Sequence, residues 1–221
     1  MTDVSRETPS TPELARRAFS SAPALRLAER YVELLATAGV ERGLIGPREA
    51  PKLWERHVLN CLALSSAISP GATVADLGSG AGLPGLVLAI GRPDLHVTLV
   101  EPLLRRTTFL GEAVEELGLG NVRVRRGRAE ELHGRDLFDV VTARALAPLD
   151  RLLGWGMPLV DGRGALLAMK GSSAADEIRA AGPVLNRLRC APAELLTLTG
   201  PDGSCTATVV RVVRRDEPGL G

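Results

Sequence analysis

The chain of 221 residues is poor in aromatic side chains, with two Trp, one Tyr and three Phe, and it has only three cysteines. Cys61, Cys190 and Cys205 do not show the paired spacing of a metal site, and they do not suggest a disulfide framework. The composition therefore argues against a zinc domain and against a disulfide-stabilised secreted fold. We expect no bound metal.

Long apolar runs are also missing. No stretch reaches the roughly 20 residues of a transmembrane helix, and the polar N-terminus does not resemble a signal peptide. We therefore expect a cytoplasmic monomer without a membrane partner. Apolar residues still make up 45% of the chain, which is enough for one large α/β domain with a sizeable core.

An excess of charge is lacking too, because 27 Lys and Arg residues are balanced by 26 Asp and Glu residues, for a formal net charge of +1. Overall charge thus does not indicate a nucleic-acid-binding protein. Lysine occurs only at Lys52 and Lys170. Arginine suits phosphate and base contacts, but a GC-rich genome would produce the same bias, and the sequence gives both explanations equal weight.

The most informative stretch is residues 74–85, V-A-D-L-G-S-G-A-G-L-P-G. A short apolar strand is followed by Gly78, Gly80 and Gly82 at every second position, and Pro84 stands where a helix can begin. Strand, glycine turn and helix open a nucleotide-binding βα unit, in which a ligand approaches the backbone without a Cβ in its way.

The spacing of this loop argues against a dinucleotide, because Leu83 stands where G-x-G-x-x-G requires its third glycine. Asp76 in the strand and Glu101 at the end of the next apolar run favour a ligand with positive charge. S-adenosylmethionine carries a sulfonium and an amino group, and Glu101 can accept hydrogen bonds from both of its ribose hydroxyls. We therefore expect this cofactor. A plain glycine-rich turn with a solvated glutamate nearby is the alternative.

Periodicity predicts a flexible segment over 1–23, a helical cap over 24–70, an α/β domain over 71–215 and a C-terminal tail over 216–221. Strands and helices alternate in the domain and end in a hairpin, which predicts a mostly parallel sheet with one antiparallel strand. Thr11 and Ser173 are expected to cap helices. The expected strands are 74–77, 96–101, 121–125, 138–143, 164–170, 195–198 and 205–213, and the expected helices of the domain include 105–117, 149–157 and 173–188.

Ligands of such sheets lie at the carboxyl ends of the strands. The segment 127–130 follows the third strand and can offer N–H groups and a carboxylate to an adenine edge. Arg144 follows the fourth strand, where a transferred group and its acceptor would meet, although it could be an ordinary surface arginine. No nucleophile, triad or metal cluster is visible, which fits methyl transfer because catalysis there is mainly positioning.

A local basic stripe follows the third strand. These arginines either coat an edge or, together with Arg105, Arg106 and Lys170, neutralise phosphates, and the residues alone slightly favour the first explanation. His57 is a lone helical histidine, a type of residue that is more often structural than catalytic. The stripe consists of Arg123, Arg125, Arg126 and Arg128.

Several segments, in this order, resemble the ribosomal RNA small-subunit methyltransferase G family, also called the glucose-inhibited division protein B family. The likeness covers roughly residues 24–213, and it departs from the family at 43–45, where Gly-Leu-Ile replaces the common Asn-Leu-Thr. The segments are L-W-E-R-H-V-L-N-C-L-A-L (53–64), D-L-G-S-G-A-G-L-P-G (76–85), R-P-D-L-H-V-T-L-V-E (92–101), R-R-T-T-F-L (105–110), N-V-R-V-R-R-G-R-A-E-E-L (121–132), F-D-V-V-T-A-R-A (138–145) and A-M-K-G (168–171).

The resemblance implies a Rossmann-like class I S-adenosylmethionine-dependent methyltransferase. It implies methylation of N7 of one guanine in the decoding region of 16S ribosomal RNA, as free RNA or in a ribosomal particle. Guanine N7 holds a lone pair and loses no proton on attack, so it needs no general base. The cofactor contacts that the resemblance implies are Gly78, Leu83, Ala129, Glu130 and Arg144, and the loop and strand pattern adds Gly80, Gly82 and Glu101. The implied RNA contacts are Arg105, Arg128, Lys170 and His57, and the predicted catalytic residues are Arg144 and Arg128.

Other functions remain open at this point. A methyltransferase of a small molecule or protein is compatible with the near-neutral charge. A nicotinamide oxidoreductase and a non-catalytic ribosome-binding module are further alternatives, although the missing third glycine argues against the former.

Overall fold

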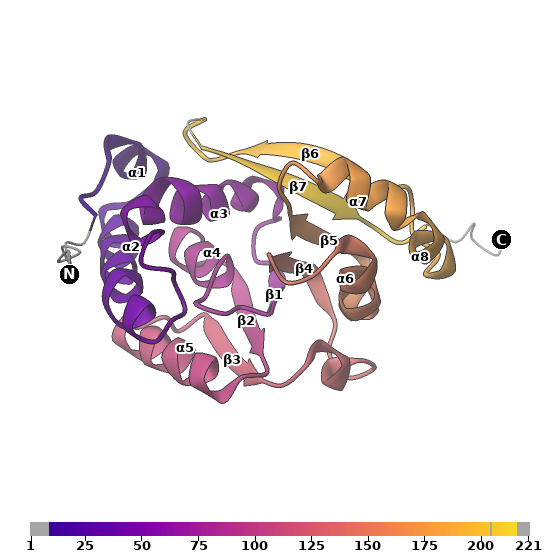
Figure 1. The fold of residues 1–221 in the computed structure, drawn as a ribbon, viewed down its shortest axis with the longest axis horizontal. Coiled ribbons are helices and arrows are strands. Elements are labelled where there is room, and N and C mark those ends of the chain that lie inside the picture. Colours follow the sequence, from indigo (N-terminus) through magenta and orange to yellow (C-terminus); the bar gives the residue numbers. More distant parts are fainter. Residues whose placement is uncertain (1–8, 204, 216–221) are drawn as a thin grey trace.

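The computed structural model describes residues 9–203 and 205–215. One sheet contains seven strands in the order β3-β2-β1-β4-β5-β7-β6 (Figure 1). Strands β1 to β5 are mutually parallel, and β7 alone runs against the rest. The predicted sheet is confirmed. The strands are β1 (Thr73–Leu77), β2 (His96–Glu101), β3 (Val122–Arg126), β4 (Phe138–Arg144), β5 (Val160–Met169), β6 (Glu194–Thr199) and β7 (Thr206–Val212).

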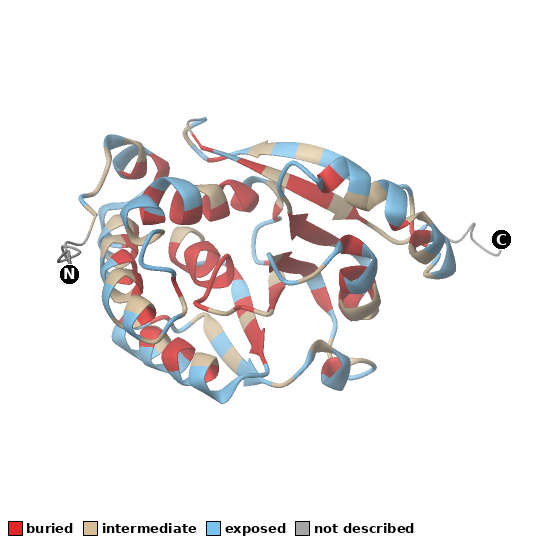
Figure 2. Cartoon of the chain, viewed as in Figure 1, coloured by how far each residue is buried: buried red, intermediate tan, exposed pale blue. Residues whose placement is uncertain are grey.

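Helices cover both faces of the sheet, and the buried strands lie between them (Figure 2). Alternation along β1 explains the two cores, because Val74 packs into one apolar cluster while Ala75 and Leu77 pack into the other. The first cluster contains side chains of α1 (Glu13–Ala18), α2 (Ala22–Leu34), α3 (Asn60–Ala63), α4 (Gly85–Gly91) and α5 (Leu104–Glu116), and the second those of α6 (Leu149–Gly156), α7 (Ala174–Ala180) and α8 (Gly182–Arg187).

The N-terminal helices pack over one face of the sheet as a helical cap, and packed structure begins before residue 24. Helix α1 buries Ala15 and Ala18, so the predicted flexible segment does not extend over residues 13–23, and residues 1–8 lie outside the described part. Thr11 does not cap α1. Pro12 holds the N-cap position, and the Thr11 hydroxyl donates to Glu29 Oε1 at 2.7 Å. Small alanines give a weak periodic signal, which is why sequence alone missed this packing.

The cap continues through two π-helical segments. Helix α2 runs directly into η1 (Leu35–Gly39), so the helical backbone continues as far as Gly39. The second π-helical segment, η3 (Leu53–Leu59), carries Trp54 and His57 on its buried side. Single π-helical turns often occur at functional sites. The short helices that complete the fold are η2 (Ala50–Lys52), η4 (Leu64–Ala67), η5 (Ala129–Leu132) and η6 (Met157–Leu159).

Three predictions towards the C-terminus are wrong in detail. The expected helix over 173–188 is split into α7 and α8, since Pro183 stands at the start of α8 and cannot donate a backbone hydrogen bond. Ser173 provides no side-chain cap; its hydroxyl donates to Glu177 Oε1 at 2.9 Å. Strand β5 begins at Val160, four residues before the prediction, because the polar and glycine residues there read as a turn.

The hairpin of β6 and β7 is confirmed, with Gly203 at a φ of +77° in its turn. The predicted tail over 216–221 lies outside the described residues. Among the helices that the structure describes, none is long and apolar enough to cross a membrane. The described residues also contain no group of three or more His, Cys, Asp or Glu side chains arranged to hold a metal ion.

Candidate active site

The glycine loop joins β1 to α4 at the carboxyl edge of the sheet. Gly78, Gly80 and Gly82 have φ values of +66°, +58° and +99°, which only glycine adopts without strain. The Gly78 N–H donates to the carbonyl of Val100 at 2.8 Å, which ties the loop to β2. The loop is therefore held in an open turn whose inner surface is backbone.

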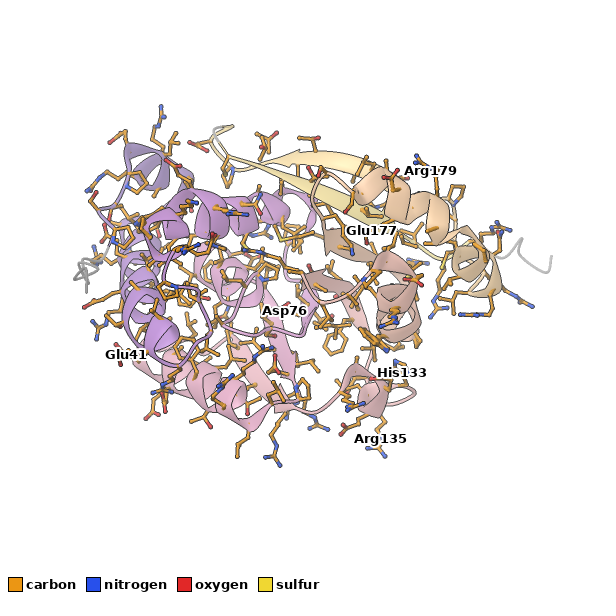
Figure 3. The ribbon with its side chains drawn as sticks, in the orientation of Figure 1. Glu41, Asp76, His133, Arg135, Glu177 and Arg179 are labelled. Atoms are coloured by element: carbon orange, nitrogen blue, oxygen red, sulfur yellow. The ribbon has the colours of Figure 1, made fainter. Side chains whose placement is uncertain are left out.

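Two buried carboxylates support this loop from beneath. Glu101 is 1% exposed; its Oε2 accepts from the Gly80 N–H at 3.1 Å and its Oε1 accepts from the Leu103 N–H at 3.0 Å. Asp76, at the centre of the molecule in Figure 3, accepts from the Gly85 N–H at 3.0 Å through Oδ2. Its Oδ1 has no partner among the described residues, and burial raises the pKa of Asp76 to about 7. The predicted ribose contact of Glu101 thus shares its carboxylate with protein N–H groups.

Tyr31 of α2 supports the same loop from the helical cap. Its buried hydroxyl donates to the carbonyl of Ala81 at 2.8 Å. A Cβ on Gly82 would lie 3.0 Å from this hydroxyl and 2.7 Å from Leu86 Cγ, so a side chain cannot fit there. Sequence reasoning missed this role of Tyr31, although it is the one tyrosine of the chain.

Three cavities lie around the glycine loop and the end of β4. A cavity of about 240 Å³ is lined by apolar groups such as Val100 and Trp155 together with residues 127–130. A second cavity of about 310 Å³ lies along the glycine loop, and a third of about 610 Å³ lies beside the end of β4. Gly78 borders the first and second cavities, and Arg144 borders the second and third. Because neighbouring cavities share these wall residues, we call the three together the hollow.

The first two cavities fit S-adenosylmethionine. An apolar slot with an indole wall suits a flat adenine, and the loop cavity, with Arg106, Arg144 and Glu49 in its wall, suits a charged amino-acid group. Gly78 lies in the wall of both cavities and places no side chain between them. A Cβ at that position would lie 2.4 Å from Leu146 Cδ1, in the passage between the two spaces.

Arg144 is held by neutral groups of the helical cap. One guanidinium nitrogen contacts His57 Nδ1 and the other donates to Cys61 Sγ at 3.2 Å. The Nε2 atom of His57 lies 3.1 Å from Glu49 Oε2, and the other oxygen of this carboxylate, Oε1, is paired with Arg56. Burial, together with the charge of Arg144, lowers the pKa of His57, and burial raises the pKa of Cys61 to about 11. His57 is 7% exposed, so its ring leaves no free nitrogen for the predicted RNA contact.

Lys170 is also engaged inside the protein. Its side chain is 10% exposed, and its Nζ donates to the carbonyl of Ala147 and to Glu177 Oε2, both at 2.7 Å. Glu177, labelled on α7 in Figure 3, also accepts from the Leu149 N–H at 2.9 Å. The predicted RNA contact thus anchors the loop 145–148 that follows β4.

The structure brings most of the predicted residues to the hollow and leaves three outside it. Gly82 belongs to the loop but lines none of the three cavities, Glu101 lies beneath the loop, and Arg105 is exposed on α5. The two predicted catalytic arginines do not share a cavity. The first cavity contains Gly78, Arg128, Ala129 and Glu130, the second Gly78, Gly80, Leu83, His57 and Arg144, and the third Arg144 and Lys170.

Sequence reasoning missed several residues of the site. Trp155 lines the first cavity, Glu49 the second, and Glu55 the third. Trp155 could have been noticed because the chain has only two tryptophans. Glu49 and Cys61 carry no signal in the sequence, since only the tertiary fold brings them to His57 and Arg144. Ile45, one of the two positions at which the chain departs from the common family pattern, lines the second cavity next to Leu44.

Comparison with known proteins shows the family of the chain. The family model of rRNA small subunit methyltransferase G matches residues 24–199. Proteins named ribosomal RNA small subunit methyltransferase G are 67% identical in Nocardioides sp., over 97% of this chain and 85% of the relative, and 54% identical in Streptomyces coelicolor, over 96% and 89%. The relative from Thermobifida fusca is 56% identical over 90% of this chain and 84% of its own length.

Solved structures share the fold at low identity. A ribosomal protein L11 methylase from Lactobacillus delbrueckii has a TM-score of 0.53 at 15% identity, covering 72% of this chain and 77% of that one. The Bacillus subtilis tRNA methyltransferase TrmK has a TM-score of 0.52 at 19% identity, covering 71% and 66%. The fold is therefore the Rossmann-like class I methyltransferase fold, as predicted. The chain is an S-adenosylmethionine-dependent methyltransferase, and it belongs to the rRNA small subunit methyltransferase G family.

Proposed function

We propose that this enzyme methylates N7 of a specific guanine in the decoding region of 16S ribosomal RNA. Its relatives are named for the small-subunit ribosomal RNA. The observation that carries the proposal is the third cavity, of about 610 Å³, which meets the cofactor side of the hollow at Arg144. This cavity opens to the protein surface. It is large enough for a nucleotide flipped out of its RNA.

The side chains around Arg144 fit an acceptor that loses no proton. His57 has both ring nitrogens engaged, and the Cys61 thiol is neutral because burial raises its pKa to about 11. Neither is free to act as a general base. A purine attacked through N7 instead gains positive charge, and the carboxylate of Glu55 in the wall of the third cavity can offset that charge.

The cofactor, when bound, supplies a methyl group on a sulfonium that is its own leaving group. The protein then has to hold the acceptor in line with that group. Gly78, Ala129 and Glu130 would hold the adenosine in the first cavity, and the glycine loop with Arg144 would hold the amino-acid group in the second. We assign Arg144 to the meeting point, since it borders both the cofactor and the acceptor cavity.

RNA contacts are proposed for exposed arginines at the edge of the hollow. Arg128 lies at the mouth of the first cavity, and Arg105 is exposed on α5. Arg123, Arg125 and Arg126 of the edge strand β3 are also exposed. These side chains can bind phosphates without reading sequence. We further propose that the enzyme acts in the cytoplasm as a monomer, on free RNA or on a ribosomal particle.

The acceptor atom is tested with two RNA substrates that differ at one position. Small-subunit RNA lacking the modification is incubated with methyl-labelled cofactor, and the labelled nucleotide is located by mass spectrometry. A matched RNA carries 7-deazaguanosine, which has a carbon in place of N7. We expect label on guanine N7 in the first RNA and none in the second. Label on another base, or on the 7-deaza RNA, would show that the acceptor is a different atom.

A methyltransferase of a small molecule or protein is the second candidate, favoured by the formal net charge of +1. Binding of RNA through phosphates weakens steeply with salt, whereas binding of a neutral metabolite does not. Activity on a free metabolite that is independent of salt, with none on RNA, would favour this second candidate.

A further inference from the structure

Arg144 differs from the other engaged cations near the hollow in having neutral acceptors. Lys170 and Arg106 are each paired with a carboxylate, Glu177 and Glu101. Within the described residues, Arg144 has no carboxylate at ion-pair distance, and its hydrogen-bond partners are an imidazole and a thiol. Its positive charge is therefore not neutralised by a direct partner.

The chemistry of the contacts defines the state of His57. A guanidinium has only donors, so the Nδ1 that faces Arg144 must carry a lone pair. The proton of the neutral ring then lies on Nε2 and points to Glu49 Oε2, 3.1 Å away. Glu49 is in turn paired with Arg56 at 3.0 Å, which holds the carboxylate in place. The result is a chain of contacts from Glu49 through His57 to Arg144.

We propose that Glu49 and His57 are positioning residues, which orient Arg144 while leaving its charge available to the bound ligands. The contact joins η3 of the cap to the end of β4, 87 residues apart in the chain. Cys61 fixes the second guanidinium nitrogen in the same way. A carboxylate in place of the imidazole would also hold Arg144, but it would compensate the charge that an anionic ligand group needs. This inference rests on the proposed role of Arg144 at the transfer site.

The protonation state and tautomer of His57 can be measured without an activity assay. In protein labelled with ¹⁵N-histidine, NMR at neutral pH should show His57 as the neutral tautomer with its proton on Nε2. Arg144→Ala should change the Nδ1 signal and leave that of exposed His96 unchanged. A protonated His57, or a proton on Nδ1, would overturn the proposal even if the proposed substrate were wrong.

The functional link is measured by a double-mutant cycle on methyl transfer. We expect Arg144→Ala to lower kcat/KM about 100-fold. His57→Ala should lower kcat/KM by a somewhat smaller factor. The double variant should lose no more than Arg144→Ala alone, because His57 acts through that arginine. If the loss in the double variant were the product of the two single losses, His57 would act independently of Arg144, and the proposal would be wrong.

Conservative and control variants keep the test independent of folding. The amide oxygen of His57→Asn can still accept from Arg144, so this variant should retain most activity where His57→Ala does not. His96 lies at the amino end of β2, away from the carboxyl ends of the strands, so His96→Ala should behave as wild type. If His57→Asn has the wild-type thermal unfolding midpoint but is as inactive as His57→Ala, the positioning role is wrong. Failure of the wild type to methylate guanine would instead contradict the proposed function and leave the NMR result standing.

Discussion

The two loops that border the hollow are held in different ways. The glycine loop after β1 is fixed mostly by backbone groups and by carboxylates of β1 and β2, through the contacts of Gly78, Gly80 and Gly85. The loop 145–148 after β4 is fixed by side chains from distant elements. Lys170 holds the carbonyl of Ala147, and His57 holds Arg144 at the start of the loop.

This difference predicts that the glycine loop is a rigid binding surface and that the shape of the loop 145–148 depends on its side-chain partners. A loop made of backbone N–H groups in rigid positive-φ geometry presents the same surface whatever the side chains nearby. A loop held by side-chain hydrogen bonds from distant elements, with Ala145 at a φ of +50°, depends on every partner that holds it. We therefore expect changes in the first loop to affect cofactor affinity, and changes around the second to affect turnover.

The largest effect is expected from Gly78→Val. A β-branched residue is strained at a φ of +66°, and its Cβ would start 2.4 Å from Leu146 Cδ1. Affinity for S-adenosylhomocysteine, measured by calorimetry, should fall by about 100-fold or more, of the order of two or three kilocalories per mole. Gly111→Ala, in α5 with no atom near its added Cβ, is the matched control and should bind normally. Normal binding by Gly78→Val would contradict the proposed position of the cofactor.

The next effect concerns the base of the glycine loop. Burial raises the pKa of Asp76 from 3.8 to about 7, so the folded state keeps a proton that the unfolded state loses. The free energy of unfolding contributed by this group is complete below pH 4 and declines as pH rises towards 7, by up to about 1.4 kcal/mol per pH unit. Asp76→Asn should flatten this decline in denaturant titrations. Equal slopes for both proteins would show that Asp76 is ionised in the folded state.

Glu101→Ala should weaken cofactor affinity by about 1–3 kcal/mol. It removes the predicted ribose acceptor and also leaves the N–H groups of Gly80 and Leu103 without their partner. Glu101→Gln keeps one acceptor oxygen and should lose less. An unchanged dissociation constant for Glu101→Ala, measured by calorimetry, would exclude a ribose contact.

The second loop is tested with Lys170→Met, which should lower kcat by about 10-fold, since a lost charged hydrogen bond is worth about 1.5–3 kcal/mol. The salt dependence of RNA binding should not change, because the ammonium already binds Ala147 and Glu177. Exposed Arg128→Ala is the comparison and should reduce the salt slope by about one. A reduced slope for Lys170→Met would restore its predicted phosphate contact.

The smallest effect is expected from Tyr31→Phe. The change removes only the buried hydrogen bond to Ala81, so unfolding should become easier by about 1 kcal/mol. Cofactor affinity should fall only a few-fold, because the other backbone contacts of the loop remain. Thermal unfolding with and without cofactor measures both quantities. A loss as large as that of Glu101→Ala would mean that the cap, rather than β2, fixes the loop.

Much of the fold and one half of the site could be predicted from local sequence. Gly78, Gly80 and Gly82 have a recognisable spacing because a turn of this kind needs positive φ at fixed positions. The strands of the parallel sheet appear as short apolar runs. The start of β5 was missed because Asp161, Gly162 and Arg163 are residue types common in turns, although they belong to the strand.

The sequence by itself determined the order of strands and helices, the glycine turn and the kind of cofactor, because these depend on residues close together in the chain. The tertiary structure decided what the polar side chains do. His57 and Lys170 were expected at the RNA surface and lie inside, joined to Arg144 and Glu177. Which polar groups meet depends on how the cap packs against the sheet, and contacts of that kind, up to 87 residues apart, leave no periodic pattern in the chain.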